Sequence, residues 1–378
     1  MAKRIYVGVN NVARKVKRIY VGVNNVARKV KKIYVGINNI ARLAFIGIDR
    51  VDAPNLSQAR AYLAGASNNN YALFAGGTYP ATDAVDAYNS SLTRTTPTGL
   101  SQARYLLAGA SIGDYVLFGG GYNAYTSKYF YETVDAYNGS LTRTTPTALS
   151  QNRQSLAGAS NNNYALFAGG TNSDYASSSV VDAYNSSLTR TTPTGLSQRR
   201  SLLAGASNGD YALFAGGFKY DGNSEVYNTV DAYNSSLTRV TLTGLSQNKR
   251  ALAGASNGNY AIFAGGATWT WNPESTVDAY SGSLTKYALT PLYTHRYSLS
   301  GASVKKGYAL FGGGYAYDYI DIVDVYDKSL VNDRAPDFRY SYRSELAGAS
   351  IGNYAIFAGG IDRYHENGTN IVEAYLVD

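Results

Sequence analysis

The sequence contains no cysteine, one methionine, two histidines and few charged residues, which make up 16% of its 378 positions. The lack of cysteine excludes thiol chemistry and a disulfide-stabilised scaffold. Isolated histidines are seldom metal ligands and no metal-binding signature occurs, so we expect neither a metal nor a cofactor. No apolar run approaches a membrane span, and the start MAKRIYVGVNN lacks the apolar core of a signal peptide. We therefore expect no membrane insertion, and synthesis in the cytoplasm without a signal peptide.

What the chain has instead is a sevenfold repeat rich in glycine and tyrosine, of which there are 39 and 36. Each repeat contains a leucine-led LAGAS-type segment, a Tyr-x-x-Phe segment that ends in two glycines, and a third segment typified by Val-Asp-Ala-Tyr. The phenylalanines of the repeat are 44 to 49 residues apart: Phe74, Phe118, Phe167, Phe214, Phe263, Phe311 and Phe357. This period is typical of β-propeller blades, so the sequence predicts an all-β, seven-bladed β-propeller.

Residues 156–194 illustrate one predicted blade. Short segments rich in aromatic and β-branched residues, separated by Asn, Gly, Ser and Pro, predict antiparallel strands at Leu156–Ser160, Tyr164–Ala168, Val180–Tyr184 and Leu188–Thr192. The pair Gly169–Gly170 suits a turn with positive φ or a close approach of backbones near a narrow axis. The small residues of LAGAS fit a crowded inner strand.

The two ends of the repeat region predict how the ring closes. The last repeat ends with its third strand at Ile371–Tyr375 and has no fourth strand of its own. The segment Leu43–Val51 stands directly before the first blade, where it can complete the last blade and remove the free sheet edges. We therefore predict a propeller domain over residues 46–378 that is closed by a strand at 43–51.

Residues 1–45 form a separate predicted segment built from three 14-residue units, Lys3–Val16, Lys17–Val30 and Lys31–Ala44. Alternating apolar residues flank an Asn-Asn pair in each unit, which predicts a small β-hairpin. The segment carries 11 Lys or Arg and no acid, whereas the rest of the chain has 23 basic and 26 acidic residues. No nucleic-acid-binding motif accompanies this charge, so we expect no nucleic-acid partner. Hairpins of this size bury little and are expected to dock on a partner or on copies of themselves.

The repeats differ most between their predicted second and third strands. These loops carry aromatic residues set among Asn, Ser and Gly, a composition typical of antibody binding loops. Because strands alternate in direction, all seven loops emerge at one end of the propeller. We predict ligand binding by the loop residues Tyr122, Tyr125, Tyr129, Tyr220, Trp269, Trp271, Tyr317, Tyr364 and His365.

A basic residue precedes the first strand of every blade and forms a second candidate site at the same end. Guanidinium groups are suited to carboxylate or phosphate, which predicts ligand contacts for Arg104, Arg153, Arg200, Arg296 and Arg343. An alternative is ion pairing within the blades. The third strands supply one acid each for such pairs: Asp86, Asp135, Asp182, Asp231, Asp278, Asp324 and Glu373.

Two resemblances follow from these motifs. An Arg followed by LAGAS, Tyr-x-x-Phe-x-Gly-Gly and Val-x-x-Tyr resembles the kelch repeat over residues 46–378. Where the kelch fourth strand carries Trp, six blades have Leu92, Leu141, Leu188, Leu237, Leu284 or Leu330. The basic IYVGVNNVARKV units followed by blades with SSLTRTTPT turns resemble tail-associated proteins of phages and prophages of Gram-positive bacteria. That second resemblance implies a virion tail component that contacts other tail proteins through residues 1–45 and meets the host with its propeller.

With the aromatic loops, this resemblance predicts a non-enzymatic tail protein of a phage or phage-tail-like particle that binds a bacterial cell-surface glycan or protein. A homo-oligomer would combine several weak contacts. Two alternatives stay open, a protein-binding scaffold and a polysaccharide depolymerase, because the loops hold enough carboxylates for a glycosidase pair. Kelch-type copper oxidases need a Cys-modified Tyr, and sialidases carry S-x-D-x-G-x-T-W boxes; the sequence has neither.

Overall fold

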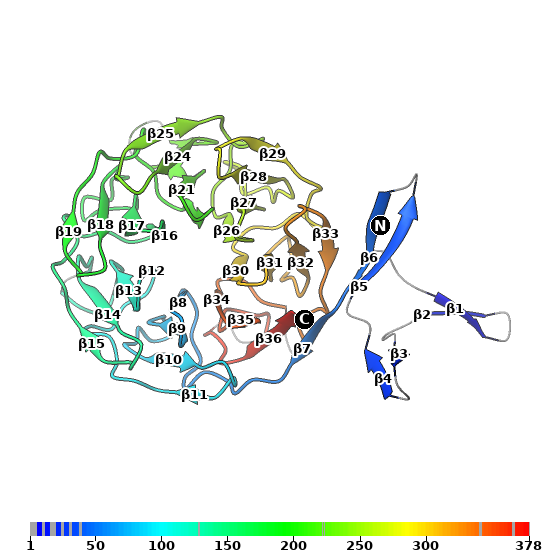
Figure 1. Cartoon of the computed structure of the whole chain (residues 1–378). Coiled ribbons are helices and arrows are strands. Elements are labelled where there is room, and N and C mark those ends of the chain that lie inside the picture. Colours follow the sequence, from blue (N-terminus) through cyan, green and yellow to red (C-terminus); the bar gives the residue numbers. More distant parts are fainter. Residues whose placement is uncertain are drawn as a thin grey trace.

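The computed structural model describes residues 6–9, 12–15, 20–23, 26–29, 32–37, 40–127, 129–220, 222, 224–339, 342–364 and 367–377. Strands, turns and irregular loops make up these residues, and none of them is helical. Figure 1 shows seven sheets arranged as a ring around a central axis, with the N-terminal hairpins outside the ring. The predicted all-β, seven-bladed propeller is therefore confirmed.

Six blades follow the chain order, each a four-stranded antiparallel meander whose first strand lines the axis (Figure 1). The first blade consists of β8 (Ala64–Ser67), β9 (Ala72–Ala75), β10 (Val85–Tyr88) and β11 (Arg94–Thr95), and the second of β12 (Ala108–Ile112), β13 (Tyr115–Gly119), β14 (Val134–Tyr137) and β15 (Arg143–Thr144). The third comprises β16 (Ala157–Ser160), β17 (Ala165–Ala168), β18 (Val181–Tyr184) and β19 (Arg190–Thr191).

The remaining blades in chain order have the same organisation. The fourth comprises β20 (Ala204–Ser207), β21 (Ala212–Ala215), β24 (Val230–Tyr233) and β25 (Arg239–Leu242), with a small hairpin of β22 (Phe218–Lys219) and β23 (Glu225–Val226) in its loop. The fifth comprises β26 (Ala253–Ser256), β27 (Tyr260–Ala264), β28 (Val277–Ser281) and β29 (Lys286–Ala288). The sixth comprises β30 (Ser300–Val304), β31 (Tyr308–Gly312), β32 (Val323–Tyr326) and β33 (Asn332–Arg334).

The last blade joins the two ends of the propeller. Its strands are β34 (Ala347–Ile351), β35 (Tyr354–Ala358), β36 (Val372–Val377) and β7 (Ile48–Val51), and β7 pairs antiparallel with β36. The predicted closing strand at 43–51 is therefore too long at its start. Residues 43–46 belong instead to β6 (Ile40–Ile46), which pairs with β5 (Lys32–Ile37), and Gly47 separates the two strands.

The N-terminal segment contains three antiparallel hairpins, one for each 14-residue unit (Figure 1). The first pairs β1 (Tyr6–Val9) with β2 (Val12–Lys15), the second pairs β3 (Tyr20–Val23) with β4 (Val26–Lys29), and the third pairs β5 with β6. The Asn-Asn pairs at which the sequence predicts the turns lie outside the described residues.

The leucines that the sequence predicts at the start of the fourth strands lie in turns and not in those strands. Leu188 has a φ of 58°, and its N–H donates to the Asn185 carbonyl oxygen at 2.9 Å. The strand that follows, β19, contains only two residues and starts at Arg190, so the predicted strand 188–192 is shortened at both ends. The corresponding leucines of the other blades also have positive φ: Leu92, Leu141, Leu237, Leu284 and Leu330.

Neighbouring blades pack face to face and enclose a core between each pair. Between the third and fourth blades, Leu166 and Val181 pack with Phe214 and Tyr233, and all four side chains are fully buried. The Phe214 and Tyr233 rings meet edge to face with centroids 6.1 Å apart. Phenylalanine and tyrosine therefore recur in every blade because they fill the wedge between blades.

The middle glycine of LAGAS is required because the inner strands approach one another closely around the axis. A Cβ added to Gly158 would lie 2.1 Å from the carbonyl oxygen of Gly109 in the preceding blade. The same close approach recurs from blade to blade and returns from Gly65 to Gly348, which closes the ring. These glycines let seven inner strands share one narrow axis.

The glycine pair after each second strand has positive φ, as the sequence predicts. In the third blade the φ values are 68° at Gly169 and 103° at Gly170. The Gly170 N–H donates to the carbonyl oxygen of Arg200 in the next blade at 3.0 Å. The equivalent bond occurs at all seven blade boundaries, with Gly360 donating to Arg60 across the closure.

Candidate ligand-binding face and axial pocket

The arginines predicted to bind a ligand lie inside the blades. Arg104, Arg153, Arg200, Arg296 and Arg343 have no exposed surface. Four of them form ion pairs with a buried third-strand aspartate: Arg104–Asp135 at 2.8 Å, Arg153–Asp182 at 2.5 Å, Arg200–Asp231 at 2.7 Å and Arg296–Asp324 at 2.6 Å. A ligand on the surface cannot contact a fully buried guanidinium, so all five are removed from the candidate site. For these four arginines, the alternative prediction of ion pairing within the blades is confirmed.

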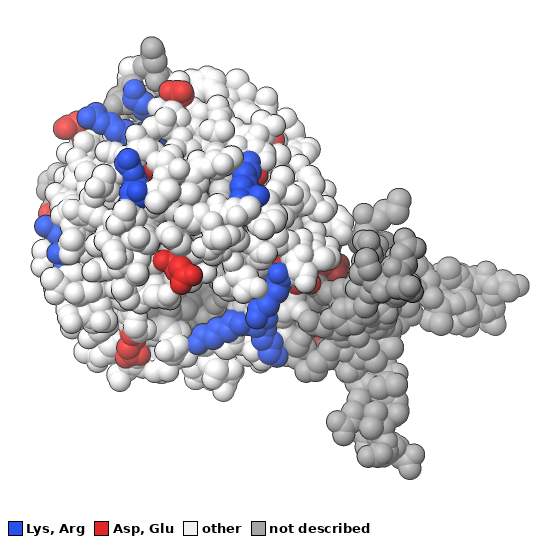
Figure 2. Space-filling view, turned by 45° about the horizontal axis from the view of Figure 1, so that its top comes forward, with Lys and Arg blue, Asp and Glu red and all other residues white. Residues whose placement is uncertain are grey.

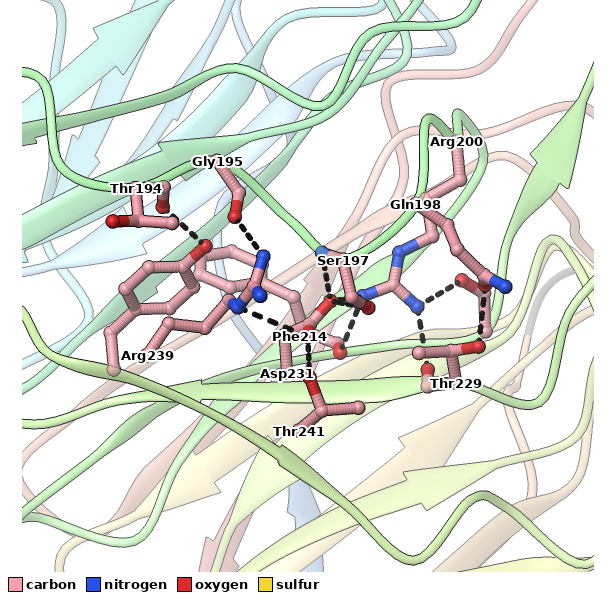
Figure 3. Close-up of polar contacts among 12 residues, drawn as sticks. Thr194, Gly195, Ser197, Gln198, Arg200, Phe214, Thr229, Asp231, Arg239 and Thr241 are labelled. Atoms are coloured by element: carbon pink, nitrogen blue, oxygen red, sulfur yellow. Dashed lines mark hydrogen bonds and ion pairs between the residues drawn. The ribbon is translucent and has the colours of Figure 1, made fainter.

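Figure 3 shows this arrangement in the fourth blade. Arg200 points from the segment before β20 to Asp231 on β24 and also donates to the Thr229 carbonyl oxygen at 2.6 Å. Ser197 donates to the same carboxylate with its backbone N–H at 3.1 Å and its hydroxyl at 3.0 Å. The buried carboxylate therefore fixes the connecting segment to the blade, and burial lowers the pKa of Arg200.

A second basic residue, on the fourth strand, approaches the same carboxylate. This residue was not predicted from the sequence. Arg239 Nε lies 3.9 Å from Asp231, and Nη1 donates to the Gly195 carbonyl oxygen at 2.6 Å (Figure 3). The equivalent residues in other blades are Arg94, Arg143, Arg190 and Lys286. The signal was present in the repeated SLTR motif, whose basic residue recurs at the same distance from the third-strand acid.

Two blades depart from the arginine–aspartate pattern. In the fifth blade Lys249 replaces arginine, and its Nζ donates to the backbone oxygen of Thr276 at 2.9 Å. Burial lowers the pKa of Lys249 to about 8. In the last blade Arg343 donates to the carbonyl oxygens of Gly359 and Ile371 at 2.8 and 2.7 Å, and burial lowers its pKa to about 10.

The variable loops carry the exposed aromatic residues that the sequence placed in a binding site. Exposure is greatest for Tyr364 at 79%, Tyr317 at 74% and Tyr125 at 72%. Tyr220, Trp269, Tyr129 and Trp271 are also exposed, whereas Tyr122 is partly buried. His365 lies outside the described residues. The loops thus expose aromatic side chains from several blades at one end of the propeller.

Aromatic contacts join loops of neighbouring blades on this face. Tyr122 contacts Tyr129 and Phe130 with centroid distances of 6.1 and 5.1 Å. Phe130 meets Tyr175 of the next blade at 5.3 Å, and Tyr122 meets Tyr105 at 5.5 Å. Part of the aromatic set therefore packs the loops against each other and holds the exposed rings in place.

The two tryptophans of the chain share one cation, Arg250. Its guanidinium carbon lies 3.8 Å from the Trp271 ring centroid, 5.6 Å from that of Trp269 and 4.5 Å from that of Phe218. Arg250 Nη2 also donates to the Trp269 carbonyl oxygen at 3.1 Å, and the residue is 5% exposed. Arg250 therefore fixes the tryptophan loop while leaving 50% of Trp269 and 43% of Trp271 exposed.

A cavity of about 540 Å³ lies beside Trp269, between the loops of the fourth and fifth blades. Its wall combines the indole with the side-chain amides of Asn228, Gln247 and Asn248 and the carboxylate of Glu225. An aromatic face bordered by amide donors and acceptors suits a ligand with both apolar faces and hydroxyl groups.

A second cavity, of about 410 Å³, lies on the propeller axis at the same end. Below its opening, seven equivalent residues with φ between 51° and 55° form a closed ring of backbone hydrogen bonds. Each N–H donates to the carbonyl oxygen of the preceding blade at 2.9–3.1 Å, in the order Tyr62, Leu106, Ser155, Leu202, Ala251, Ser298 and Glu345. We call these seven residues the axial ring.

The axial ring contains a carboxylic acid that the sequence analysis did not single out. Glu345 lines the axial pocket with Tyr62, Ser298 and Trp271. Desolvation raises the pKa of Glu345 to about 7, and a side-chain hydrogen bond with Ser298 opposes the rise. The sequence contained a signal for this pocket. Two residues separate the basic residue from the invariant leucine of each blade, and these two residues change from blade to blade.

Charged residues are few on the face of the molecule drawn in Figure 2. Figure 2 shows Lys, Arg, Asp and Glu as separate groups on a mostly uncharged surface in that view. Within the described ranges there is no cluster of three or more His, Asp or Glu side chains placed to hold a metal ion. The described residues also contain no helix long and apolar enough to cross a bilayer.

Comparison with known proteins supports the fold. No family model matches the chain, and no curated protein matches it. The solved structure of YjhT is similar, with a TM-score of 0.58 and 15% sequence identity over 75% of this chain and 99% of YjhT. At this identity the similarity concerns the fold alone. The seven sheets and this structural neighbour define the protein as a seven-bladed β-propeller.

Proposed function

We propose that the protein is a non-enzymatic, kelch-like tail protein of a phage or phage-tail-like particle that binds a ligand on the bacterial cell surface. The observation that carries the proposal is the position of its exposed aromatic residues. Seven of the predicted loop residues are exposed at one end of the propeller, while the repeated basic residues are buried in the blades. Rigid aromatic side chains on variable loops are characteristic of binding surfaces.

The cavity beside Trp269 favours a glycan as the ligand. Sugars have apolar C–H faces that stack on indole rings and hydroxyl groups that bond to amides. Asn228, Gln247 and Asn248 are exposed beside the half-exposed Trp269. Arg250 holds the loop in place, so that little conformational entropy is lost when a ligand binds.

The N-terminal hairpins suit attachment to other tail proteins or to further copies of the chain. The three hairpins are separate two-stranded sheets, which are marginal in isolation. Their 11 basic residues and lack of acids favour an acidic docking surface. Attachment of several propellers to one particle would raise the avidity for a repeated surface ligand.

The experiment is binding of the full chain to purified wall glycans of Gram-positive bacteria, measured by calorimetry. Trp269→Ala should weaken binding at least about tenfold, because alanine scans place such losses at aromatic residues that become buried when the ligand binds. The matched control is Tyr287→Ala, which removes an aromatic residue 42% exposed on β29, outside the variable loops. Equal affinity of the two variants contradicts the proposed site. Capture of a protein and no glycan favours the scaffold, and release of oligosaccharides favours the depolymerase.

A further inference from the structure

The wall of the axial pocket combines a repeated set of leucines with side chains that differ from blade to blade. Its floor is formed by the invariant leucines that follow the axial ring: Leu63, Leu107, Leu156, Leu203, Leu252, Leu299 and Leu346. The axial ring adds different side chains above this apolar floor, with hydroxyl groups from Ser155 and Ser298. The pocket is therefore a shared cavity of all seven blades whose specificity is set by non-equivalent residues.

The backbone of the axial ring contributes no free donor to a ligand. Every axial-ring N–H already donates to the neighbouring blade, including the bond from Tyr62 to Glu345 at 3.0 Å that closes the circle. The donors that remain in the wall belong to side chains, chiefly the hydroxyls and the Trp271 indole. An anionic ligand would thus lose its hydration without finding a cationic partner in the wall.

Glu345 is the one charged residue among the residues that line the axial pocket. Its carboxyl group forms a side-chain hydrogen bond with Ser298 and interacts electrostatically with Tyr62, which lines the same pocket together with the leucines. A carboxylate beside an aromatic ring and apolar walls complements a protonated amine, which gains an ion pair and a cation–π contact together.

We propose that the axial pocket binds a small organic ammonium group, with Glu345 as its counter-ion, Tyr62 as an aromatic contact and the leucine floor against its carbon skeleton. This site is separate from the cavity beside Trp269 and goes beyond the proposed recognition of a surface glycan by the loops. Bound ammonium stabilises the ionised form of Glu345, so binding is stronger at pH 8 than at pH 5.5. Tyr62 and Tyr297, whose pKa values are raised by burial, stay neutral over this range, and Arg250 near Tyr297 stays charged.

The test is titration of the full chain with cyclohexylammonium chloride, cyclohexanol and cyclohexanecarboxylate, followed by calorimetry or NMR. We expect the ammonium ion to bind at least about tenfold more tightly than the alcohol, which corresponds to one charge-assisted hydrogen bond, and the carboxylate to bind least. Glu345→Gln should abolish this preference and the pH dependence, whereas Glu274→Gln, outside the pocket lining, should change neither.

A second variant tests the location without changing charge. Ala251→Leu should fill the pocket and weaken ammonium binding, and leucine is compatible with this backbone because Leu106 and Leu202 occupy the same position with φ of 55° and 52°. Equal binding of the ammonium ion and the alcohol, or an unchanged affinity in Glu345→Gln, overturns the proposal. Either result leaves glycan binding at Trp269 unaffected, so the two proposals fail independently.

Discussion

The guanidinium of Arg250 lies against the Trp271 ring, with its carbon 3.8 Å from the ring centroid. Arg250 is 5% exposed and its Nε has no hydrogen-bond partner, so the indole supplies much of its electrostatic stabilisation. Burial lowers the pKa of Arg250, although guanidinium remains charged at neutral pH. A loop on the candidate binding face is therefore tied to the propeller through a cation that belongs to the blade.

Trp271→Ala is expected to lower the free energy of unfolding by about 2 kcal/mol, because it removes the nearest of the aromatic rings that contact a desolvated cation. Urea unfolding measures the difference. Tyr317→Ala is the control, since Tyr317 is 74% exposed and should change stability by less than about 0.5 kcal/mol. Similar stabilities of the two variants would show that the Arg250 contact contributes little.

Gly158→Ala should destabilise the propeller by about 2 kcal/mol or more, because the new methyl group collides with the backbone of the neighbouring inner strand. The added Cβ would lie 2.1 Å from the Gly109 oxygen. This is a backbone atom, which cannot move aside as a flexible side chain can. Gly282→Ala is the matched control, since its added Cβ would meet only Asp210 at 3.7 Å. Thermal unfolding of both variants checks the prediction, and a stable Gly158→Ala protein would refute the tight axial packing.

Lys249 should make stability depend on pH in the alkaline range. Its pKa is lowered to about 8 in the folded protein from an ordinary value of 10.5, so between these values the unfolded chain binds more protons. Stability contributed by this residue is therefore present above pH 10.5 and is lost as the pH falls through about 8. We expect the native protein to gain stability relative to Lys249→Arg between pH 8 and pH 10, on the order of 2 kcal/mol. If the urea midpoints of the two proteins change equally over that pH range, the result would contradict the burial of a charged lysine.

Removal of β7 should damage the last blade and open the ring. A chain of residues 47–378 keeps the pairing of β7 with β36, whereas a chain of residues 52–378 leaves β36 as a free edge. We expect the shorter chain to unfold at a lower temperature and to aggregate, while the longer chain melts as the full protein does. Identical melting of the two chains would show that β7 is not needed for closure.

The repeat period and the glycine pairs made the propeller predictable from the sequence. Seven phenylalanines at near-constant spacing specify the number of blades, and Gly169–Gly170 marks a positive-φ turn that other residues adopt at a cost. The end of the closing strand was also apparent from the missing fourth strand after Tyr375. Its start was not, because Leu43–Ile46 has the same apolar pattern whether it pairs with β5 or with β36.

The candidate site was less predictable, because one sequence pattern fits either exposed or buried residues. Arg200 and its equivalents fitted either a ligand site or ion pairs within the blades. They are buried, and in five blades the arginine pairs with the third-strand aspartate. Glu345 and Arg250 were overlooked because they sit next to a strongly repeated motif. Their positions in the axial pocket and beside the tryptophans depend on contacts between blades, which a single repeat does not contain.

The most direct test of the central claim is binding of the full chain to intact Gram-positive cells, with Trp269→Ala/Trp271→Ala and Tyr287→Ala measured in parallel. We expect saturable binding that the double tryptophan variant loses and the Tyr287 variant keeps, and that soluble wall glycan competes away. Binding that is unchanged in the tryptophan variant, or no binding to any cell tested, would contradict recognition of the host surface by this face of the propeller.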